Sequence, residues 1–242
     1  MTCETFQSLQ NRDKSSIKLF SRTLYLDSYE YEQGVSSNIV VPGSLKNHIQ
    51  FCCSFGTSQF ILDVINEGYR IPFYSTPPPS FSSRSKKSAL AHPSFVEEAI
   101  SELLLTHRVF ETDVIPRNVN PLSVSIQSSG KMRLILDLRF INKHLWKTSV
   151  KFEDLRVAIN YLEKGHFMFS FDIRSGYYHV LIFPPHQSFL GFSWFYKSKT
   201  RYFCFRVLPF GLSSAPYIFT KLFQASCRLL EAAKHSYRIL PR

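Results

Sequence analysis

The 242-residue chain is expected to adopt an α+β fold, in which an antiparallel sheet packs on helices. Apolar residues recur at helical spacing over residues 93–108 and again over residues 155–162. Short apolar runs bounded by polar turns, the pattern of antiparallel strands, recur through much of the chain beyond residue 109. A content of 44% hydrophobic and 15% aromatic residues is enough to form a substantial core.

Two changes in composition divide the chain into three predicted parts, over residues 1–70, 71–165 and 166–242. Residues 1–40 are polar and lack periodicity, and the segment 71–87 contains Pro77-Pro78-Pro79, which favours extended backbone. We expect a leader with one short helical segment, then an extended arm that leads into a helix and a hairpin. The third part is expected to hold strands and a final helix.

The best-defined elements are a helix and a hairpin. The helix is expected to begin at Pro93, where Ser94 and Glu97 have the spacing of a capping box. The hairpin joins two strand-like runs, over 122–126 and 133–138, through a polar turn. Further elements are expected as a helix over 155–162, strands over 166–171, 179–183, 189–195 and 202–207, and a last helix that begins near Ser214.

Charge indicates a polyanionic partner. The chain has 29 Lys and Arg residues against 18 Asp and Glu residues, a formal net charge of +11, and a pI near 9.5. Such an excess favours binding to phosphates through the release of counterions. The alternative is a basic but inert solvated surface.

Cysteines and hydropathy exclude several classes of protein. The five cysteines are odd in number and lack the paired spacing of a zinc site, so we expect reduced thiols in an intracellular protein. The N-terminal residues are polar where a signal peptide is apolar, and no apolar run reaches the roughly 18 residues that a membrane span needs. Neither secretion nor a membrane partner is expected.

A single carboxylate, Asp172, stands where chemistry is most plausible. It follows the apolar run 166–171 and precedes a turn that contains Gly176. From this residue alone two interpretations remain open: the carboxylate caps the turn, or it binds a divalent cation that also contacts a substrate phosphate.

Three segments together resemble the motifs of reverse transcriptases, in family order and at similar separations. Residues 169–180 (FSFDIRSGYYHV) resemble motif A, residues 130–143 (GKMRLILDLRFINK) resemble the fingers motif R-x-x-x-D-x-R-x-x-N-K, and residues 208–216 (LPFGLSSAP) resemble motif B. The resemblance covers residues 71–221. Its details, such as STPPPSF, NPLSVSIQ and FPPHQSFLGFSW, look most like retrotransposons of the DIRS type.

This resemblance implies a fold and a function. Residues 71–165 would hold the fingers, and residues 166–242 the first part of the palm, of a right-hand polymerase. The implied activity is RNA-directed DNA synthesis, in which deoxynucleoside triphosphates extend a DNA primer along an RNA template. Two Mg²⁺ or Mn²⁺ ions would activate the primer hydroxyl and stabilise developing charge.

The resemblance also implies roles for individual residues. Asp172 would ligate the metal ions, with help from the Ile173 carbonyl. Arg133, assisted by Lys131, would contact the phosphates of the incoming nucleotide. Tyr177 would exclude the ribose 2′-hydroxyl. Phe210 and Gly211 would lie beside the nucleotide sugar and the template base.

Structural alternatives stand beside these roles. Lys131 and Arg133 could be a solvated basic loop, Tyr177 could be a core aromatic, although Tyr178 fits the core better, and residues 209–211 could be a simple strand-to-helix turn. Asp137 and Arg139 lie two residues apart on a strand and therefore on one face. We expect them to form a structural ion pair outside the site.

The sequence departs from the family after motif B. Complete reverse transcriptases continue with an Asp-Asp box, which supplies the second acid for the two metals, and then with a thumb. No Asp follows Asp172 in this chain. We therefore expect a fragment that stops before this box and does not polymerise alone. The alternatives are a non-catalytic nucleic-acid-binding remnant and an unstable remnant without a role.

Overall fold

The structure is a computed structural model that describes residues 42–54, 56–74, 77–150, 173, 175–196 and 198–232, with side chains up to residue 224. All of these residues belong to one compact unit, Val40–Arg242. Residues 1–40 of the predicted leader, the helix over 155–162 and the strand over 166–171 lie outside the described residues. Among the helices that are described, none combines the length and the apolar character of a membrane span.

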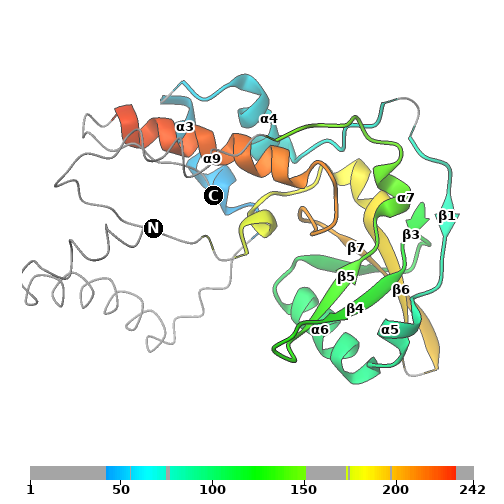
Figure 1. The fold of residues 1–242 in the computed structure, drawn as a ribbon. Helices are drawn as coiled ribbons and strands as arrows, with labels where there is room; N and C mark the ends of the chain where they lie inside the picture. The colour runs from blue at the N-terminus through cyan, green and yellow to red at the C-terminus, as the bar shows by residue number, and fades with distance from the viewer. Residues whose placement is uncertain are drawn as a thin grey trace, which may run out of the picture. The chain divides into compact units, whose positions relative to one another are not determined.

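A five-stranded sheet forms the centre of this unit (Figure 1). Its strands follow the order β1 (Phe81–Ser82), β3 (Asn118–Val119), β6 (Gly191–Tyr196), β7 (Lys199–Phe205) and β2 (Val109–Thr112). The pairs β6–β7 and β7–β2 are antiparallel, whereas β1–β3 and β3–β6 are parallel. The α+β prediction is confirmed, but the sheet is mixed rather than antiparallel throughout. The helices between β1 and β3 provide the long crossover that parallel pairing needs.

The predicted hairpin is confirmed as the antiparallel pair β4 (Leu122–Ile126) and β5 (Met132–Leu136). Side chains alternate between the two faces of a strand, so the buried Leu122 and Leu136 share the inner face. Arg133 lies opposite Ser125 on the outer, exposed face. The hairpin therefore covers core on one side and presents polar groups to solvent on the other.

The helical elements are η1 (Ser44–His48), α3 (Ile49–Ser54), α4 (Gln59–Glu67), α5 (Lys87–Leu90), α6 (Pro93–Leu105), α7 (Arg139–Asn142), η2 (Gly176–His179), η3 (Pro184–Leu190) and α9 (Ala215–Ala232). Helix α6 begins at Pro93, as predicted, but the predicted capping box is wrong. His92 is the N-cap and makes no side-chain cap bond. Because Pro93 occupies the first helical position, Ser94 lies inside the first turn and cannot cap it.

The strand predicted over 179–183 is also wrong. Leu181 and Ile182 form isolated bridges with Val207 and Tyr69, and no strand continues from them. Pro184 and Pro185 begin η3 directly afterwards, and prolines cannot donate hydrogen bonds to a ladder. The other two predicted strands are confirmed as β6 and β7, with shifted ends.

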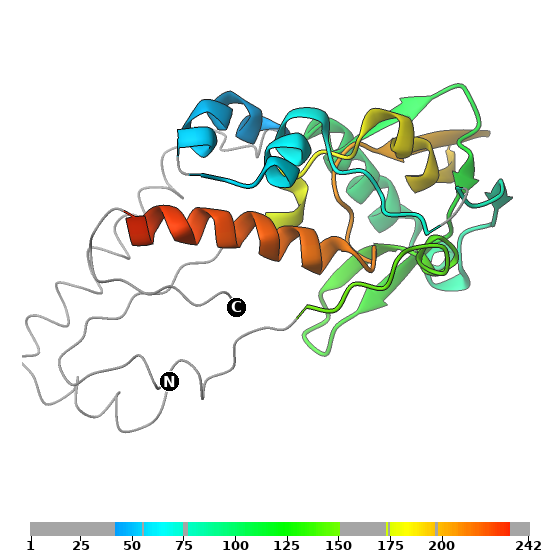
Figure 2. The same cartoon turned by 90° about the horizontal axis from the view of Figure 1, so that it is seen from above.

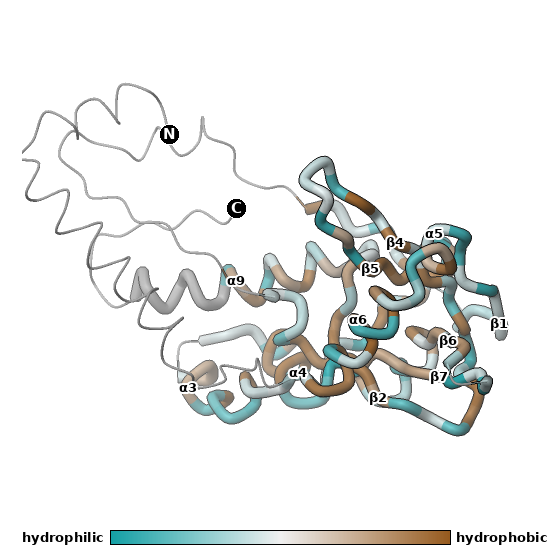
Figure 3. The backbone as a smooth tube through the Cα atoms, turned by 90° about the horizontal axis from the view of Figure 1, so that it is seen from below, coloured by the Kyte–Doolittle hydropathy of each residue, from teal (hydrophilic) through white to brown (hydrophobic). Residues whose placement is uncertain are grey.

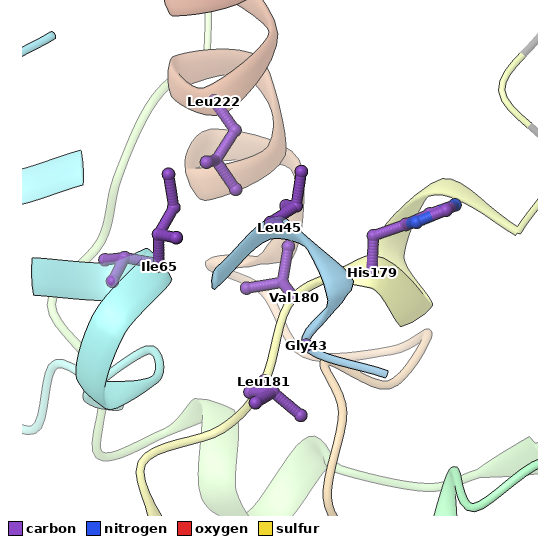
Figure 4. A pocket seen from close by; sticks show the side chains of 8 residues that line it. Gly43, Leu45, Ile65, His179, Val180, Leu181 and Leu222 are labelled. Atoms are coloured by element: carbon purple, nitrogen blue, oxygen red, sulfur yellow. The ribbon is translucent and has the colours of Figure 1, made fainter. Parts of the chain in front are cut away.

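The core lies where α4, α6 and the sheet meet, and hydrophobic segments gather there in Figure 3. Helix α9 runs beside α4 (Figure 2). Figure 4 shows their contact, in which Leu45, Ile65, Val180 and Leu222 converge while His179 points away. The space left between them is only about 10 Å³, so this contact is a packing seam without room for a ligand.

One side chain joins the fingers-like hairpin region to the loop that precedes α9. The side-chain amide of Asn142 donates a hydrogen bond to the Gly211 carbonyl (2.8 Å) and accepts one from the Ser213 N–H (2.9 Å). Gly211 has φ +99°, and a Cβ there would lie 3.1 Å from the Leu136 carbonyl oxygen. Only a residue without a side chain adopts this conformation readily against the end of β5. The loop is therefore fixed by the backbone conformation of Gly211 and by the hydrogen bonds of Asn142.

His186 makes a second long-range link. Its Nδ1 accepts a hydrogen bond from the Ile71 N–H at 2.9 Å, so the imidazole is neutral in the folded chain. Its ring lies 5.4–5.8 Å from the rings of Phe73, Phe183 and Phe189. Burial, and secondarily the Arg70 guanidinium, lowers the pKa of His186.

Replacing Asn142 tests the first link. Asn142→Ala should lower the free energy of unfolding by about 0.5–1.5 kcal/mol, because two exposed backbone groups of the loop exchange their partner for water. Urea denaturation gives this value, and hydrogen exchange at the Ser213 amide reports on the loop. Asn142→Asp is the matched control, since it keeps the acceptor for Ser213 and loses only the donor. Equal exchange at Ser213 in Asn142→Ala and the unmodified chain would contradict the assignment.

Titration of His186 should make stability depend on pH. Because its folded pKa lies below the unfolded value of about 6.5, this histidine stabilises the fold fully above that pH. The contribution is lost as the pH falls through the folded pKa. We expect the free energy of unfolding to drop as the pH falls below about 6.5, and to drop less in His186→Gln, whose amide oxygen can still accept the Ile71 N–H. Identical slopes in both proteins would show that His186 is not responsible.

Candidate nucleotide-binding site

The described candidate residues come from three separate segments. Arg133 and Lys131 belong to the hairpin, Tyr177 to η2, and Phe210 with Gly211 to the loop before α9. Asp172, the predicted catalytic carboxylate, lies outside the described residues. Its neighbour Ile173 is described and is 37% exposed.

Tyr177 and Phe210 meet, although they come from different motifs. Their ring centroids lie 4.9 Å apart, and Phe219 of α9 approaches Tyr177 edge-on at 5.3 Å. A Cβ on Gly176 would lie 2.7 Å from the Phe219 ring, so this glycine allows α9 to pack directly on η2. Burial raises the pKa of the Tyr177 hydroxyl. The half-buried tyrosine is thus held between two aromatic rings.

Tyr177 and Tyr178 are both half-buried and both pack against the core, so the preference for Tyr178 as the core residue stays a prediction. The Tyr178 ring lies 5.5 Å from that of Phe210, and the Arg108 guanidinium lies over it at 4.5 Å. Burial raises the pKa of Tyr178, and the positive charge of Arg108 opposes this shift. Phe210 itself is 54% exposed, so one face of this aromatic group is open to solvent.

An open hollow of about 260 Å³ lies next to this group. It is lined by Lys86, Ser123, Ile135, Leu136, Asp137, Leu138, Arg139 and Gly211. Gly211 belongs both to the hollow and to the loop that carries Phe210. The hollow and the aromatic group are therefore neighbouring parts of one surface.

Asp137 organises the positive charges of the hollow. Its carboxylate accepts hydrogen bonds from the Arg139 side chain at 2.9–3.1 Å and lies 2.5 Å from the Lys86 ammonium. Arg139, and then Lys86, holds the pKa of the Asp137 carboxyl well below its usual range. The predicted Asp137–Arg139 ion pair is confirmed, but its predicted place on a strand is wrong, because β5 ends at Leu136 and Arg139 begins α7. The pair's place in the hollow and its partner Lys86 were missed, because sequence separation hides which lysine reaches this carboxylate.

Arg133 lies on the same face of β5 as Ile135, which lines the hollow. Lys131 lies beside the turn of the hairpin, and both residues are exposed. Neither forms an ion pair with any other residue that the structure describes. These two cations are thus available to a ligand. This arrangement is compatible both with phosphate binding and with a solvated basic loop, the two interpretations of the sequence.

A metal site was predicted at Asp172 with the carbonyl of Ile173. Over the described ranges, which exclude Asp172, no three His, Cys, Asp or Glu side chains come together as metal ligands.

Sequence reasoning also assigned no role to Asn142, although it stands in the matched fingers motif. Its hydrogen bonds depend on the loop position, which no local pattern in the sequence reveals.

Comparison with known proteins finds sequence similarity to parts of two viral polyproteins. No protein-family model matches the chain. The genome polyprotein of Petunia vein clearing virus (isolate Shepherd) is 30% identical over 97 residues, which are 40% of this chain and 4% of the polyprotein. The putative enzymatic polyprotein of Cassava vein mosaic virus is 26% identical over 95 residues, or 39% of this chain and 14% of that protein. The chain thus spans only a small part of either polyprotein.

A solved structure extends the likeness to the fold. The crystal structure of the prototype foamy virus protease–reverse transcriptase (CSH mutant) matches with a TM-score of 0.51 and 20% identity. The match covers 67% of this chain and 21% of the viral chain. The chain therefore has a reverse transcriptase-like fold, whose sheet and helices are those of the fingers and palm of a right-hand polymerase.

Proposed function

We propose that the chain is part of a reverse transcriptase domain, a kind of domain that transfers deoxynucleotides to a primer 3′ hydroxyl under the direction of an RNA template. One observation carries the proposal: the matched aromatic and glycine residues of motifs A and B meet beside a hollow bordered by the matched fingers strand. In this proposal residues 1–70 are a leader, residues 71–165 the fingers and residues 166–242 the first part of the palm.

The exposed fingers residues would bind the nucleotide phosphates. The guanidinium of Arg133 offers paired donors that suit a phosphate, and Lys131 adds a second positive charge. Because Asp137 already neutralises part of the charge of Arg139 and Lys86, Arg133 is the less committed guanidinium on this face. The net charge of +11 supports the nucleic-acid partners, an RNA template and a DNA primer.

The aromatic group would select the sugar. Tyr177 is fixed by Phe210 and Phe219, so its ring cannot move aside easily for a larger substrate. We assign it the exclusion of the ribose 2′-hydroxyl. The exposed Phe210 and the side-chain-free Gly211 would lie against the nucleotide sugar and the template base.

Magnesium or manganese would be held by the Asp172 carboxylate and the Ile173 carbonyl, because oxygen donors of these two kinds suit hard divalent cations. When bound, the metal would supply charge stabilisation for phosphoryl transfer. This chain's own contribution is to hold the phosphates, with Arg133 and Lys131, and to orient the sugar, with Tyr177.

Origin and location are also part of the proposal. The matched strings described above favour a DIRS-type retrotransposon as the source. We also propose an intracellular location, because the cysteine spacing offers neither a disulfide framework nor a zinc site. The second candidate function is a non-catalytic nucleic-acid-binding domain. It is favoured by the formal net charge of +11 and by the exposed cations Arg133 and Lys131, which can contact phosphates without any metal ion.

Primer extension separates the two functions. The 242-residue chain should show no extension above a mock preparation, because Asp172 alone cannot offset the repulsion between two metal ions about 4 Å apart. A chimera that adds the Asp-Asp hairpin and thumb of a related reverse transcriptase should extend a primer and lose this activity on Asp172→Asn. An inactive chimera that still binds primer–template would favour the binding domain. Extension by the short chain would overturn the expected incompleteness.

Arg133 can be tested in the same chimera. Arg133→Ala should raise the KM for deoxynucleotides by roughly tenfold or more, since a hydrogen bond to a charged group contributes about 1.5–3 kcal/mol. Steady-state kinetics on a fixed primer–template gives this value. Arg133→Lys keeps the charge without the paired donors and should recover only part of the loss. An unchanged KM in Arg133→Ala would refute the phosphate-binding role.

A further inference from the structure

Two segments on either side of the hairpin region pair with each other and sort their side chains onto two faces. The Trp146 N–H donates to the Pro72 carbonyl at 2.9 Å, and the Tyr74 N–H donates to the His144 carbonyl at 3.1 Å. Phe73 and Leu145 are partners in this antiparallel bridge. Alternation therefore directs these two side chains inward and Tyr74, His144 and Trp146 to the other face.

Burial agrees with this sorting. Leu145 is 4% exposed, and the Phe73 ring packs 4.9 Å from that of Phe189. By contrast, Tyr74 is 48% exposed and Trp146 is 61% exposed. The inner face of the pair belongs to the core, and the outer face presents aromatic rings to solvent. We call Tyr74, His144 and Trp146 the aromatic strip.

The three rings of the aromatic strip lie next to one another, two of them parallel and the third edge-on. Tyr74 and His144 are parallel within 7° at a centroid distance of 6.4 Å, and Trp146 meets Tyr74 edge-on at the same distance. Phe140 of α7 lies 5.1 Å from His144 and stacks on Phe81 at 4.1 Å. Single exposed aromatics are common on protein surfaces, but a supported series of adjacent rings is not explained by the core.

The charged residues next to the strip in the sequence are all basic. Residues 69–96 and 138–152, which contain the whole strip, include no Asp or Glu. Lys143 and Lys147 lie next to His144 and Trp146 in the sequence, and both are exposed. No carboxylate from the described part of the chain pairs with either lysine. A ligand for this surface should therefore offer both flat apolar faces and negative charge.

We propose that the aromatic strip binds single-stranded nucleic acid. Bases stack on Tyr74 and Trp146, and Lys143 and Lys147 contact the phosphates. Paired bases in a duplex hide their faces, so the strip discriminates in favour of single strands. The inference deepens the proposed function, on which it rests in one respect: the strand in question is template that has not yet been copied.

The position of the strip in the fold suits this role. It follows α7, the same helix whose Asn142 holds the Gly211–Ser213 loop and whose Arg139 lines the hollow. A strand that leaves the proposed template position beside Gly211 can therefore continue along α7 and reach Tyr74 and Trp146. Phe140 belongs to α7 and touches His144, so the ring contacts also begin at this helix.

Tryptophan fluorescence offers a direct test with the 242-residue chain. The chain has two tryptophans, Trp146, which is 61% exposed, and Trp194, which is 6% exposed. Oligo(dT) and oligo(U) of about 12 nucleotides, within the usual site size, should each quench Trp146, whereas a duplex of equal length should quench it less. The Trp146→Phe variant keeps a stacking ring and should lose the quenching while it retains binding. Absence of quenching by both single strands would overturn the proposal.

Binding by anisotropy of a labelled oligonucleotide gives the energetic test. Tyr74→Ala with Trp146→Ala should raise the Kd for single strands about tenfold or more and leave duplex binding nearly unchanged. Phe195→Ala is the matched control, because Phe195 is a similarly exposed aromatic (66%) on β6, and it should change neither Kd. If the double variant does not unfold cooperatively, Lys143→Glu with Lys147→Glu replaces it and should weaken single-strand binding similarly.

The outcomes also separate this inference from the proposed function. Quenching of Trp146 and weaker binding by the double variant, together with an inactive chimera, would support the role of the strip and refute the proposed polymerase function. An active chimera whose double variant binds single strands as tightly as the Phe195→Ala control would refute the role of the strip and leave the proposed polymerase function standing.

Discussion

The side-chain amide of Asn142 is the contact on which the arrangement of the candidate site depends. It uses its donor on the Gly211 carbonyl and its acceptor on the Ser213 N–H, and thereby fixes the loop from both ends. That loop carries Phe210 toward Tyr177 and leads directly into α9. Helix α9 in turn packs Phe219 against Gly176. A continuous series of contacts thus runs from the fingers motif through motif B to the turn of motif A.

Electrostatics adds a second constraint, which acts through Asp137. Lys86 and Arg139 would repel each other at the rim of the hollow without a carboxylate between them, and Asp137 lies within hydrogen-bonding distance of both. The side chain of this aspartate is only 9% exposed, whereas those of Lys86 and Arg139 are 40% and 78% exposed. A largely buried carboxylate therefore holds two more exposed cations together at the rim of the hollow.

The elements that were predicted correctly are those that depend on short-range sequence patterns. The hairpin, helix α6 and helix α9 follow from alternation, helical spacing and the Pro93 signal, which need no knowledge of the remaining chain. The parallel joins of β1 and β3 could not be predicted, since two-residue strands carry no periodicity. The strand predicted over 179–183 does not form, because Pro184 and Pro185 begin η3 directly after it. Within the candidate site, the motifs proposed Arg133, Tyr177, Phe210 and Gly211, whose roles stay predictions. The partners Lys86 and Asn142 depend on tertiary distances, which no spacing in the sequence encodes.

Helix α7 is short, yet its side chains contact several separate parts of the molecule. Its four residues complete about one helical turn, so their side chains point in all directions around the axis. Arg139 faces the hollow, Phe140 supports the aromatic strip, Ile141 is fully buried and Asn142 holds the motif B loop. An inserted or deleted residue here would rotate every later side chain by about 100° and give each neighbour the wrong partner. The spacing of the fingers motif around Asp137, Arg139 and Asn142 is therefore a geometric requirement of the fold as well as a property of the proposed substrate site.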